Sequence, residues 1–170
     1  MGKPAIVIVP YDPAWPGIFA RLRDEIVAVL GTTALRVEHV GSTSVLGLAA
    51  KPVIDIDAVI AAEADLPEAI RKLAAVGYAY EGERGIARRH AFAQPDGLPV
   101  HHLYVCDERS PELRRHLAFR DYLRANPTEA ATYGALKKRL AAQFGSDRDG
   151  YTDAKSDFIA GVLAKSPPTS

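Results

Sequence analysis

Two aspartates separated by one residue, Asp55 and Asp57, are the strongest candidates for chemistry in this sequence. They interrupt an apolar, β-branched run that is typical of a core strand, and alternate side chains of a strand point to the same face. Two carboxylates on one face repel each other, and burying them unpaired costs on the order of several kcal/mol or forces protonation. A divalent cation such as Mg²⁺ removes this conflict, because it prefers carboxylate and phosphate oxygens. The alternative is that both acids lie at the wet end of a strand and pair with arginines.

A run of small residues, Gly41-Ser42-Thr43-Ser44, interrupts the strand predicted before the aspartates. Glycine allows the backbone to approach a ligand closely, and the amide and hydroxyl groups of such a turn can bind phosphate oxygens. Lys51 lies between this turn and the aspartates and can meet a phosphate as a point charge. Each feature alone also fits an ordinary loop, but together, with a strand on either side, they predict a site for a metal ion and phosphates.

Residues 10–16 read PYDPAWP, and residues 38–56 read EHVGSTSVLGLAAKPVIDI. Further along the chain are HLYV at 102–105, LAFRDYLR at 117–124 and YTDAK at 151–155. Together these segments resemble the GrpB family. This resemblance implies a nucleotidyltransferase-like fold, in which a Gly-Ser turn and an Asp-x-Asp strand handle a nucleotide and its metal ion.

The sequence departs from the usual nucleotidyltransferase pattern in one respect. Such enzymes present a third carboxylate on a later strand, but the strand predicted over residues 98–106 contains no acid. His102 can take that position, as a ligand for a transition metal or as a general base that deprotonates an acceptor hydroxyl. Glu38, just before the Gly-Ser turn, is the other candidate metal ligand, and its alternative is a pairing with Arg36 or a lysine on the surface.

Basic residues elsewhere are candidates for holding phosphates or an acidic acceptor. A cluster before the predicted hairpin consists of Arg84, Arg88, Arg89 and His90. Arg89 is the best single candidate in it, although charges on an edge strand also serve to deter aggregation. Arg120 and Lys155 lie inside the GrpB-like segments, whereas the other basic residues of the C-terminal helices, including Arg124 and Lys137, are expected to face solvent. The residues expected to be structural are His101, Cys106, His116, Tyr133 and Tyr151.

Helical and strand-like patterns follow each other along the chain. Helices are predicted from Asp12 as N-cap and Pro13 to Gly31, from Asp65 to Gly77, from Ser110 through Leu123, from Asn126 to Gly145, and over residues 150–164. Strands are predicted over residues 35–40, 52–60 and 78–81, and over an antiparallel hairpin of 88–94 and 98–106. Residues 6–9 are expected to form a strand or extended arm, and 45–50 a short helix or loop. This order predicts an α/β (α+β) fold, a mixed sheet with a C-terminal helical part.

The composition is that of a soluble globular protein. There are 21 basic and 21 acidic side chains, so bulk nucleic-acid binding and membrane binding are not expected. The single cysteine excludes an intramolecular disulfide. A signal peptide and an apolar run long enough to span a membrane are both missing, which favours the cytoplasm. We expect one domain over residues 1–165 and a disordered tail over 166–170.

These observations lead to three hypotheses. The first is a nucleotidyltransferase that uses Mg²⁺ or Mn²⁺ to transfer a nucleoside monophosphate from a nucleoside triphosphate to a small-molecule acceptor. The second is a nucleotide- or metal-binding module that has lost catalysis with the third carboxylate. The third is a hydrolase or transferase that uses His102 with a transition metal.

Overall fold

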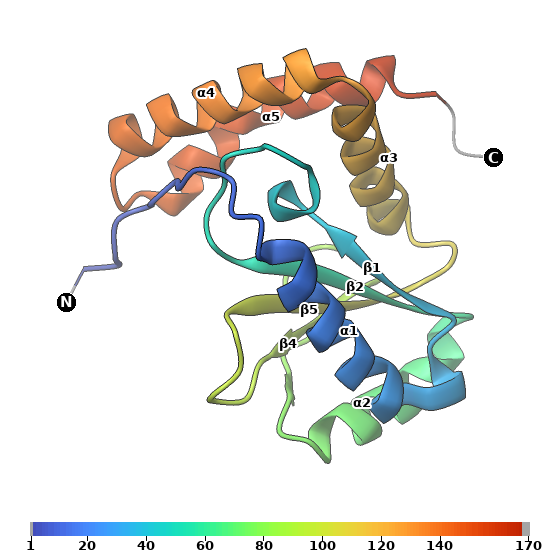
Figure 1. The fold of residues 1–170 in the computed structure, drawn as a ribbon. Coiled ribbons are helices and arrows are strands. Elements are labelled where there is room, and N and C mark those ends of the chain that lie inside the picture. Colours follow the sequence, from blue (N-terminus) through green and yellow to red (C-terminus); the bar gives the residue numbers. More distant parts are fainter. Residues whose placement is uncertain (1, 168–170) are drawn as a thin grey trace.

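The computed structural model describes residues 2–167, which form a five-stranded mixed sheet with helices on both faces (Figure 1). The strands are β1 (Arg36–Val40), β2 (Ile54–Ile60), β3 (Ala79–Tyr80), β4 (Arg89–Ala93) and β5 (His101–Asp107). Their order across the sheet is β1-β2-β5-β4-β3. β2 and β5 are parallel, and the other neighbours are antiparallel, including the predicted hairpin of β4 and β5.

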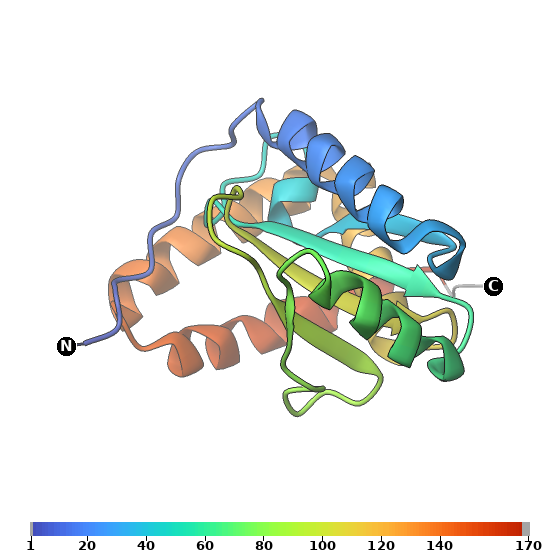
Figure 2. The same cartoon turned by 90° about the horizontal axis from the view of Figure 1, so that it is seen from below.

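The helices divide into two groups. α1 (Trp15–Leu30) and α2 (Leu66–Ala74) cover one face of the sheet, and α3 (Pro111–Ala125), α4 (Pro127–Phe144) and α5 (Arg148–Lys165) lie on the other side (Figures 1 and 2). Single 3₁₀ turns occur at Gly31–Thr33, Ser42–Ser44 and Glu63–Asp65. The predicted mixed sheet with a C-terminal helical part is confirmed.

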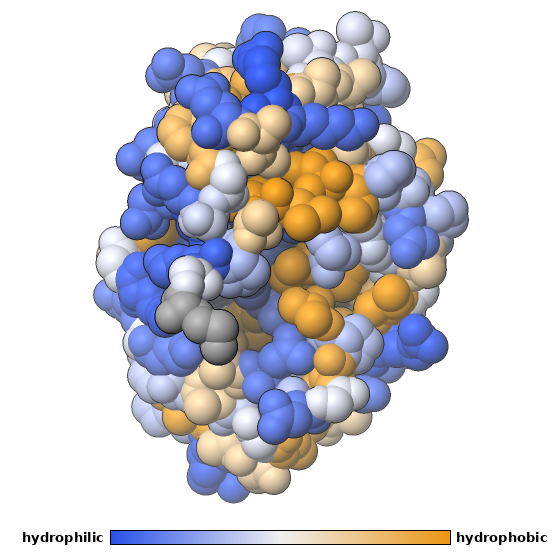
Figure 3. Space-filling view, turned by 90° about the vertical axis from the view of Figure 1, so that its left-hand side faces the viewer, coloured by the Kyte–Doolittle hydropathy of each residue, from blue (hydrophilic) through white to orange (hydrophobic). Residues whose placement is uncertain are grey.

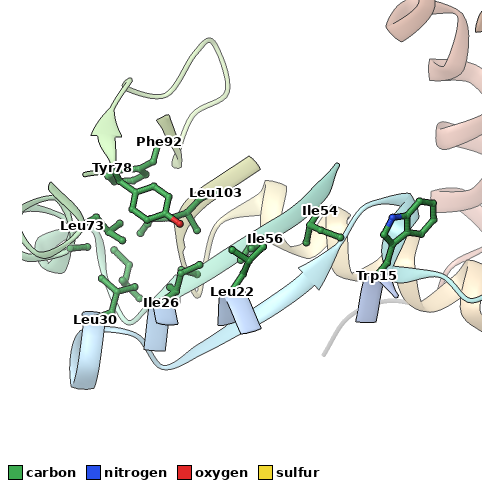
Figure 4. Close-up of a cluster of buried hydrophobic side chains, with 14 of the residues drawn as sticks. Trp15, Leu22, Ile26, Leu30, Ile54, Ile56, Leu73, Tyr78, Phe92 and Leu103 are labelled. Atoms are coloured by element: carbon green, nitrogen blue, oxygen red, sulfur yellow. The ribbon is translucent and has the colours of Figure 1, made fainter. Parts of the chain in front are cut away.

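The main core lies between the sheet and the first two helices. Trp15, Leu22 and Ile26 of α1 lie along Ile54 and Ile56 of β2, and Leu30 lies at the other end of the same cluster, toward Leu73 of α2, as Figure 4 shows. Because strand side chains alternate, Asp55 and Asp57 lie on the opposite face, toward the C-terminal helices. The apolar half of β2 thus anchors the strand, and its polar half is left for chemistry.

The start of α1 differs from the prediction. The helix begins at Trp15 with Ala14 as its N-cap residue, so Asp12 and Pro13 lie before it. The Ala14 amide donates a 2.8 Å hydrogen bond to the Asp12 carboxylate. This bond closes a turn that lies before the helix, so Asp12 is two residues upstream of the N-cap position. The Asp-Pro pattern was therefore a turn signal, since Asp side chains bond backbone amides in both settings.

The later helices follow their predicted signals closely. The hydroxyl of Ser110 accepts a hydrogen bond from the Leu113 amide and caps α3. α4 begins at Pro127 after Asn126, as predicted. α5 starts at Arg148, earlier than predicted, because the Asp147 carboxylate accepts a 3.0 Å bond from the Gly150 amide and caps it.

Residues 6–9 form an extended arm along the C-terminal helices. Val9 makes an isolated bridge with Ala50, and the Ile6 amide donates to the Gly145 carbonyl. Residues 45–50 contain no α-helix, and the one-turn helix lies at Ser42–Ser44 instead. The tail predicted over 166–170 falls mostly outside the described residues, of which Ser166 and Pro167 are the last. No helix within residues 2–167 is long and apolar enough to cross a membrane.

Candidate functional site

The Gly-Ser turn packs directly onto the first aspartate. Gly41 has a φ of 73°, and a β-carbon at this position would lie 3.0 Å from the Asp55 β-carbon and would collide with Oδ2. Only glycine fits this contact without strain. The Ser44 hydroxyl donates to the Gly41 carbonyl, and Thr43 Oγ1 lies 2.9 Å from a ring nitrogen of His39, so the turn is held from within.

The two aspartates share a face but lie in different surroundings. Asp55 is partly exposed, and its Oδ1 lies 2.9 Å from His102 Nδ1. Asp57 is fully buried, its Oδ2 lies 2.6 Å from His116 Nδ1, and its Oδ1 has no hydrogen-bond partner among residues 2–167. Burial and the repulsion of Asp55 raise the pKa of Asp57, against the opposing effect of His116.

His116 is the partner that sequence analysis did not assign. Its Nε2 lies 3.2 Å from Glu112, one helical turn earlier in α3, so the ring bridges two carboxylates. Burial by itself lowers the pKa of His116, but the bonds to Asp57 and Glu112 outweigh it and raise the pKa to about 9. A protonated His116 therefore offsets part of the charge of Asp57 at neutral pH. The spacing of Glu112 and His116 was visible in the sequence, but the contact with Asp57 was not.

A cavity of about 150 Å³ opens between the turn, the sheet and the C-terminal helices. Its lining contains seven polar or charged residues, namely Ser42, Thr43, Lys51, Asp55, His102, Lys137 and Lys155, together with Tyr151 and two small apolar residues, Ala50 and Val53. The loop before β2 and the first turns of α5 lie on the left of Figure 1, and that side is hollowed in the space-filling view of Figure 3. Several predicted site residues therefore line one cavity. They are Ser42 and Thr43 of the turn, Lys51, Asp55, His102 and Lys155.

Lys137 corrects one expectation. It was expected to face solvent, but only 2% of it is exposed. The ammonium group lies 4.7 Å from the centre of the Tyr133 ring, on the same face of α4. Because Lys137 follows Tyr133 by four residues, the helical period that placed the tyrosine in the core also carried the lysine inward.

Other predicted residues lie outside the cavity. The Glu38 carboxylate lies opposite Asp57 in the sheet register but is bonded to Arg36 at 3.0 Å and to Arg120 at 2.7 Å. Arg120 also donates to the His39 carbonyl and thereby holds α3 against β1. Neither Glu38 nor Arg120 lines the cavity, and the metal-ligand role of Glu38 stays a prediction.

The predicted basic cluster is dispersed. Arg84 pairs with Glu81, Arg88 with Asp107, and His90 with Glu63. Arg89 differs, since its guanidinium lies 4.4 Å from the centre of the Tyr104 ring and its Nε is buried without a partner among the described residues. Its charge opposes the rise in the pKa of Asp57 that burial causes. Of this cluster, Arg89 is the member near the aspartates.

The fit of a metal ion rests on Asp55 and Asp57. Within residues 2–167, no group of three or more His, Cys, Asp or Glu residues is placed to hold a metal. Two features still fit a divalent cation that takes its remaining ligands from a substrate. Asp57 Oδ1 is an orphaned buried acceptor, and Asp55 repels the charge of Asp57.

Comparison with known proteins adds to this geometry. Residues 5–165 match the sequence family described as GrpB protein. A UPF0157 protein of Halalkalibacterium halodurans is 39% identical over 97% of this chain and 84% of its own length. The UPF0157 protein YqkA of Bacillus subtilis is 34% identical over 92% of this chain, which spans only 46% of YqkA.

Two kinds of solved structure are similar to this chain. The crystal structure of GrpB from Enterococcus faecalis has a TM-score of 0.84 and 36% identity, covering 94% of this chain and 96% of that one. The Cid1 poly(U) polymerase, solved with MgGTP bound, has a TM-score of 0.56 at 14% identity, over 79% of this chain and 44% of Cid1. The second likeness concerns the fold alone, and it shows that the chain has a nucleotidyltransferase-like fold.

Proposed function

Because the chain belongs to the GrpB family and has a nucleotidyltransferase-like fold, we propose that it is a metal-dependent nucleotidyltransferase acting on a small-molecule acceptor. The observation that carries this proposal is the packing of Gly41 onto Asp55. It brings a turn rich in amides and hydroxyls to the same cavity as a carboxylate of the Asp-x-Asp pair. Phosphate oxygens and a cation can then share one small space.

In the proposed reaction, an acceptor hydroxyl oxygen bonds to the α-phosphorus of a nucleoside triphosphate. The bond from that phosphorus to the oxygen bridging to the β-phosphate breaks, and pyrophosphate leaves. Ser42 and Thr43 orient the phosphates through hydroxyl and backbone groups, and Lys51 offsets their charge. Asp55 and Asp57 would hold a divalent cation, which would supply further charge neutralisation when bound.

The acceptor proton needs a base, and His102 is placed to be one. More than half of its side chain is exposed, and its Nδ1 lies 2.9 Å from Asp55. When Nδ1 donates its hydrogen to that carboxylate, Nε2 is left unprotonated and can accept the acceptor proton. Arg89 lies near Asp57 and is proposed to offset negative charge there, whereas Arg120 and Glu38 position α3.

The test is calorimetric titration of pooled nucleoside triphosphates in the presence and absence of Mn²⁺. Asp55→Asn is expected to remove the metal dependence of binding, while Asp153→Asn, which alters an exposed carboxylate of α5, leaves it intact. Metal-dependent binding that is unchanged in Asp55→Asn would contradict the proposal. Pyrophosphate release with pooled hydroxyl acceptors then tests the transfer itself.

A second candidate is a module that binds nucleotide without transferring it. It is favoured by the contact between His116 and Asp57, which already occupies one oxygen of the buried carboxylate. Metal-dependent binding without pyrophosphate release, over all acceptors tested, would support this module. A stoichiometric transition metal in protein purified without chelator would instead support chemistry at His102.

A further inference from the structure

Three lysines from three separate segments meet at the cavity. Lys51 comes from the loop before β2, Lys137 from α4 and Lys155 from α5, and all three line it. The ammonium groups of Lys51 and Lys155 lie 4.7 Å and 4.4 Å from the centre of the same ring, Tyr151, while Lys137 lies over Tyr133. Tyrosine rings attract cations through their faces, so the two rings hold the lysines in place without neutralising them.

Their positive charge is not balanced within the described chain. None of the three makes an ion pair with an acid among residues 2–167. Other basic side chains there do, since arginines or other lysines take part in eleven of the fifteen ion pairs of these residues. Asp55 is the acid that lines the cavity, and it is engaged by His102. Lys137 is the extreme case, since it is almost fully buried and its Nζ has no hydrogen-bond partner among these residues. A buried polar group without a partner requires an explanation, and a missing anionic ligand provides one.

The acid–base properties of the lysines agree with this geometry. Burial, followed by repulsion from Lys155 and Lys51, lowers the pKa of Lys137 to about 7. Burial and repulsion from Lys51 lower the pKa of Lys155 to about 8. An anion bound between these lysines would favour their charged forms, because it offsets the burial and the mutual repulsion that lower their pKa values.

The size of the cavity limits what it can hold. Pockets for drug-sized ligands enclose roughly 300–1,000 Å³, whereas this cavity encloses about 150 Å³. A complete nucleotide does not fit inside it. A short chain of phosphates does, with the rest of the ligand outside.

We propose that Lys51, Lys137 and Lys155 form an oligophosphate site that holds the two phosphates leaving as pyrophosphate, with the α-phosphate beside Asp55. The ligand class is a nucleoside triphosphate or another chain of phosphates, rather than an ester of a single phosphate. The orientation of the nucleotide rests on the proposed transferase function, but the anion site itself does not. In the reaction, the lysines take up the charge that develops on the leaving group.

The test uses inorganic phosphates, so that neither a nucleobase nor a metal contributes to binding. Orthophosphate, pyrophosphate and tripolyphosphate are titrated into the whole chain in the presence of EDTA. Tripolyphosphate is expected to bind at least tenfold more tightly than orthophosphate. Lys137→Met should weaken tripolyphosphate binding at least tenfold, whereas Lys138→Met, which removes the exposed neighbouring charge on α4, should change it less than twofold.

Equal losses in Lys137→Met and Lys138→Met, or equal affinities for the three anions, would overturn the inference. Circular dichroism confirms that each variant is folded, and Lys155→Met repeats the test from another helix. Asp55→Asn separates the two proposals, because it should abolish metal-dependent nucleotide binding but retain tripolyphosphate binding in EDTA. If the metal dependence survives that substitution while Lys137→Met still loses tripolyphosphate, the transferase proposal fails and the anion site stands.

Discussion

Replacing Lys137 by methionine should make the ligand-free protein more stable, although it removes a residue of the proposed site. The lysine is 2% exposed and has no anionic partner among the described residues, so the folded state either buries a charge or gives up a proton. Methionine has a similar length, and it can be buried without a charge or a change of protonation. Residues kept for binding often reduce stability in this way.

The size of the effect follows from the proton affinity of the side chain. Its pKa falls from 10.5 to about 7 on folding, which corresponds to roughly 5 kcal/mol as an upper bound at about 1.4 kcal/mol per tenfold change. The variant also loses the contact between the ammonium group and Tyr133, worth about 0.5–2 kcal/mol. With imperfect packing of the new side chain, we expect a net gain of about 1–3 kcal/mol.

The stability difference between Lys137→Met and the wild type should decrease as the pH rises. Between about pH 7 and pH 10.5 the unfolded chain keeps a proton on Lys137 that the folded chain has lost, so this residue destabilises the fold most at low pH. The advantage of the variant should be complete below pH 7 and nearly gone at pH 10. Lys51, Lys155, Tyr133, Tyr151 and Asp55 face the same group, and all five are retained in Lys137→Met and in the Lys138→Met control.

Denaturant unfolding at pH 6.5 and 9.5, for the wild type, Lys137→Met and Lys138→Met, measures these differences. The exposed control should stay within about 0.5 kcal/mol of the wild type at both values. The reasoning is refuted if Lys137→Met is less stable than the wild type at pH 6.5. It is equally refuted if the difference between the two proteins is the same at both pH values.

Two further substitutions test the surroundings of the aspartates. Gly41→Ala, which places a β-carbon against Asp55 at a positive φ, should cost at least about 1–2 kcal/mol in denaturant unfolding, whereas Gly17→Ala in α1 has open space and should be neutral or stabilising. His116→Gln leaves Asp57 buried without its cationic partner and should cost about 3–5 kcal/mol, and Mg²⁺ should then raise the melting temperature of this variant more than that of the wild type. Wild-type stability of Gly41→Ala in denaturant unfolding would contradict the first prediction. An equal rise in melting temperature with Mg²⁺ in His116→Gln and in the wild type would contradict the second.

Local patterns in the sequence were sufficient to predict most elements of the fold. Ser110 marks a helix start through its own side chain, Pro127 marks the next one at the first helical position, and the alternation in β2 places two acids on one face. These signals depend on neighbours in the chain, so they can be read without tertiary structure. Asp12 shows the limit, since the same side chain can close a turn or cap a helix.

The charges of the site were harder to predict, because their partners are distant in sequence. His116 contacts Asp57 across 59 positions, and Arg120 contacts Glu38 across 82. A periodic pattern shows that a helical residue faces inward but gives no information on what it meets there. For Lys137, the position four residues after Tyr133 was readable, but the general preference of lysine for solvent pointed the other way.

The unequal surroundings of the two aspartates follow from where β2 passes beneath α3. Asp57 lies in the middle of the strand, where His116 reaches it, whereas Asp55 lies near the start, under the Gly-Ser turn and beside the exposed ring of His102. Asp57 is therefore held by His116, which offsets part of its charge, whereas the partly exposed Asp55 can exchange partners. A cation that binds the second oxygen of Asp55 would leave the hydrogen bond between Asp55 Oδ1 and His102 Nδ1 in place. The His102 ring would then keep Nε2 available to take up a proton, as the proposed transfer requires.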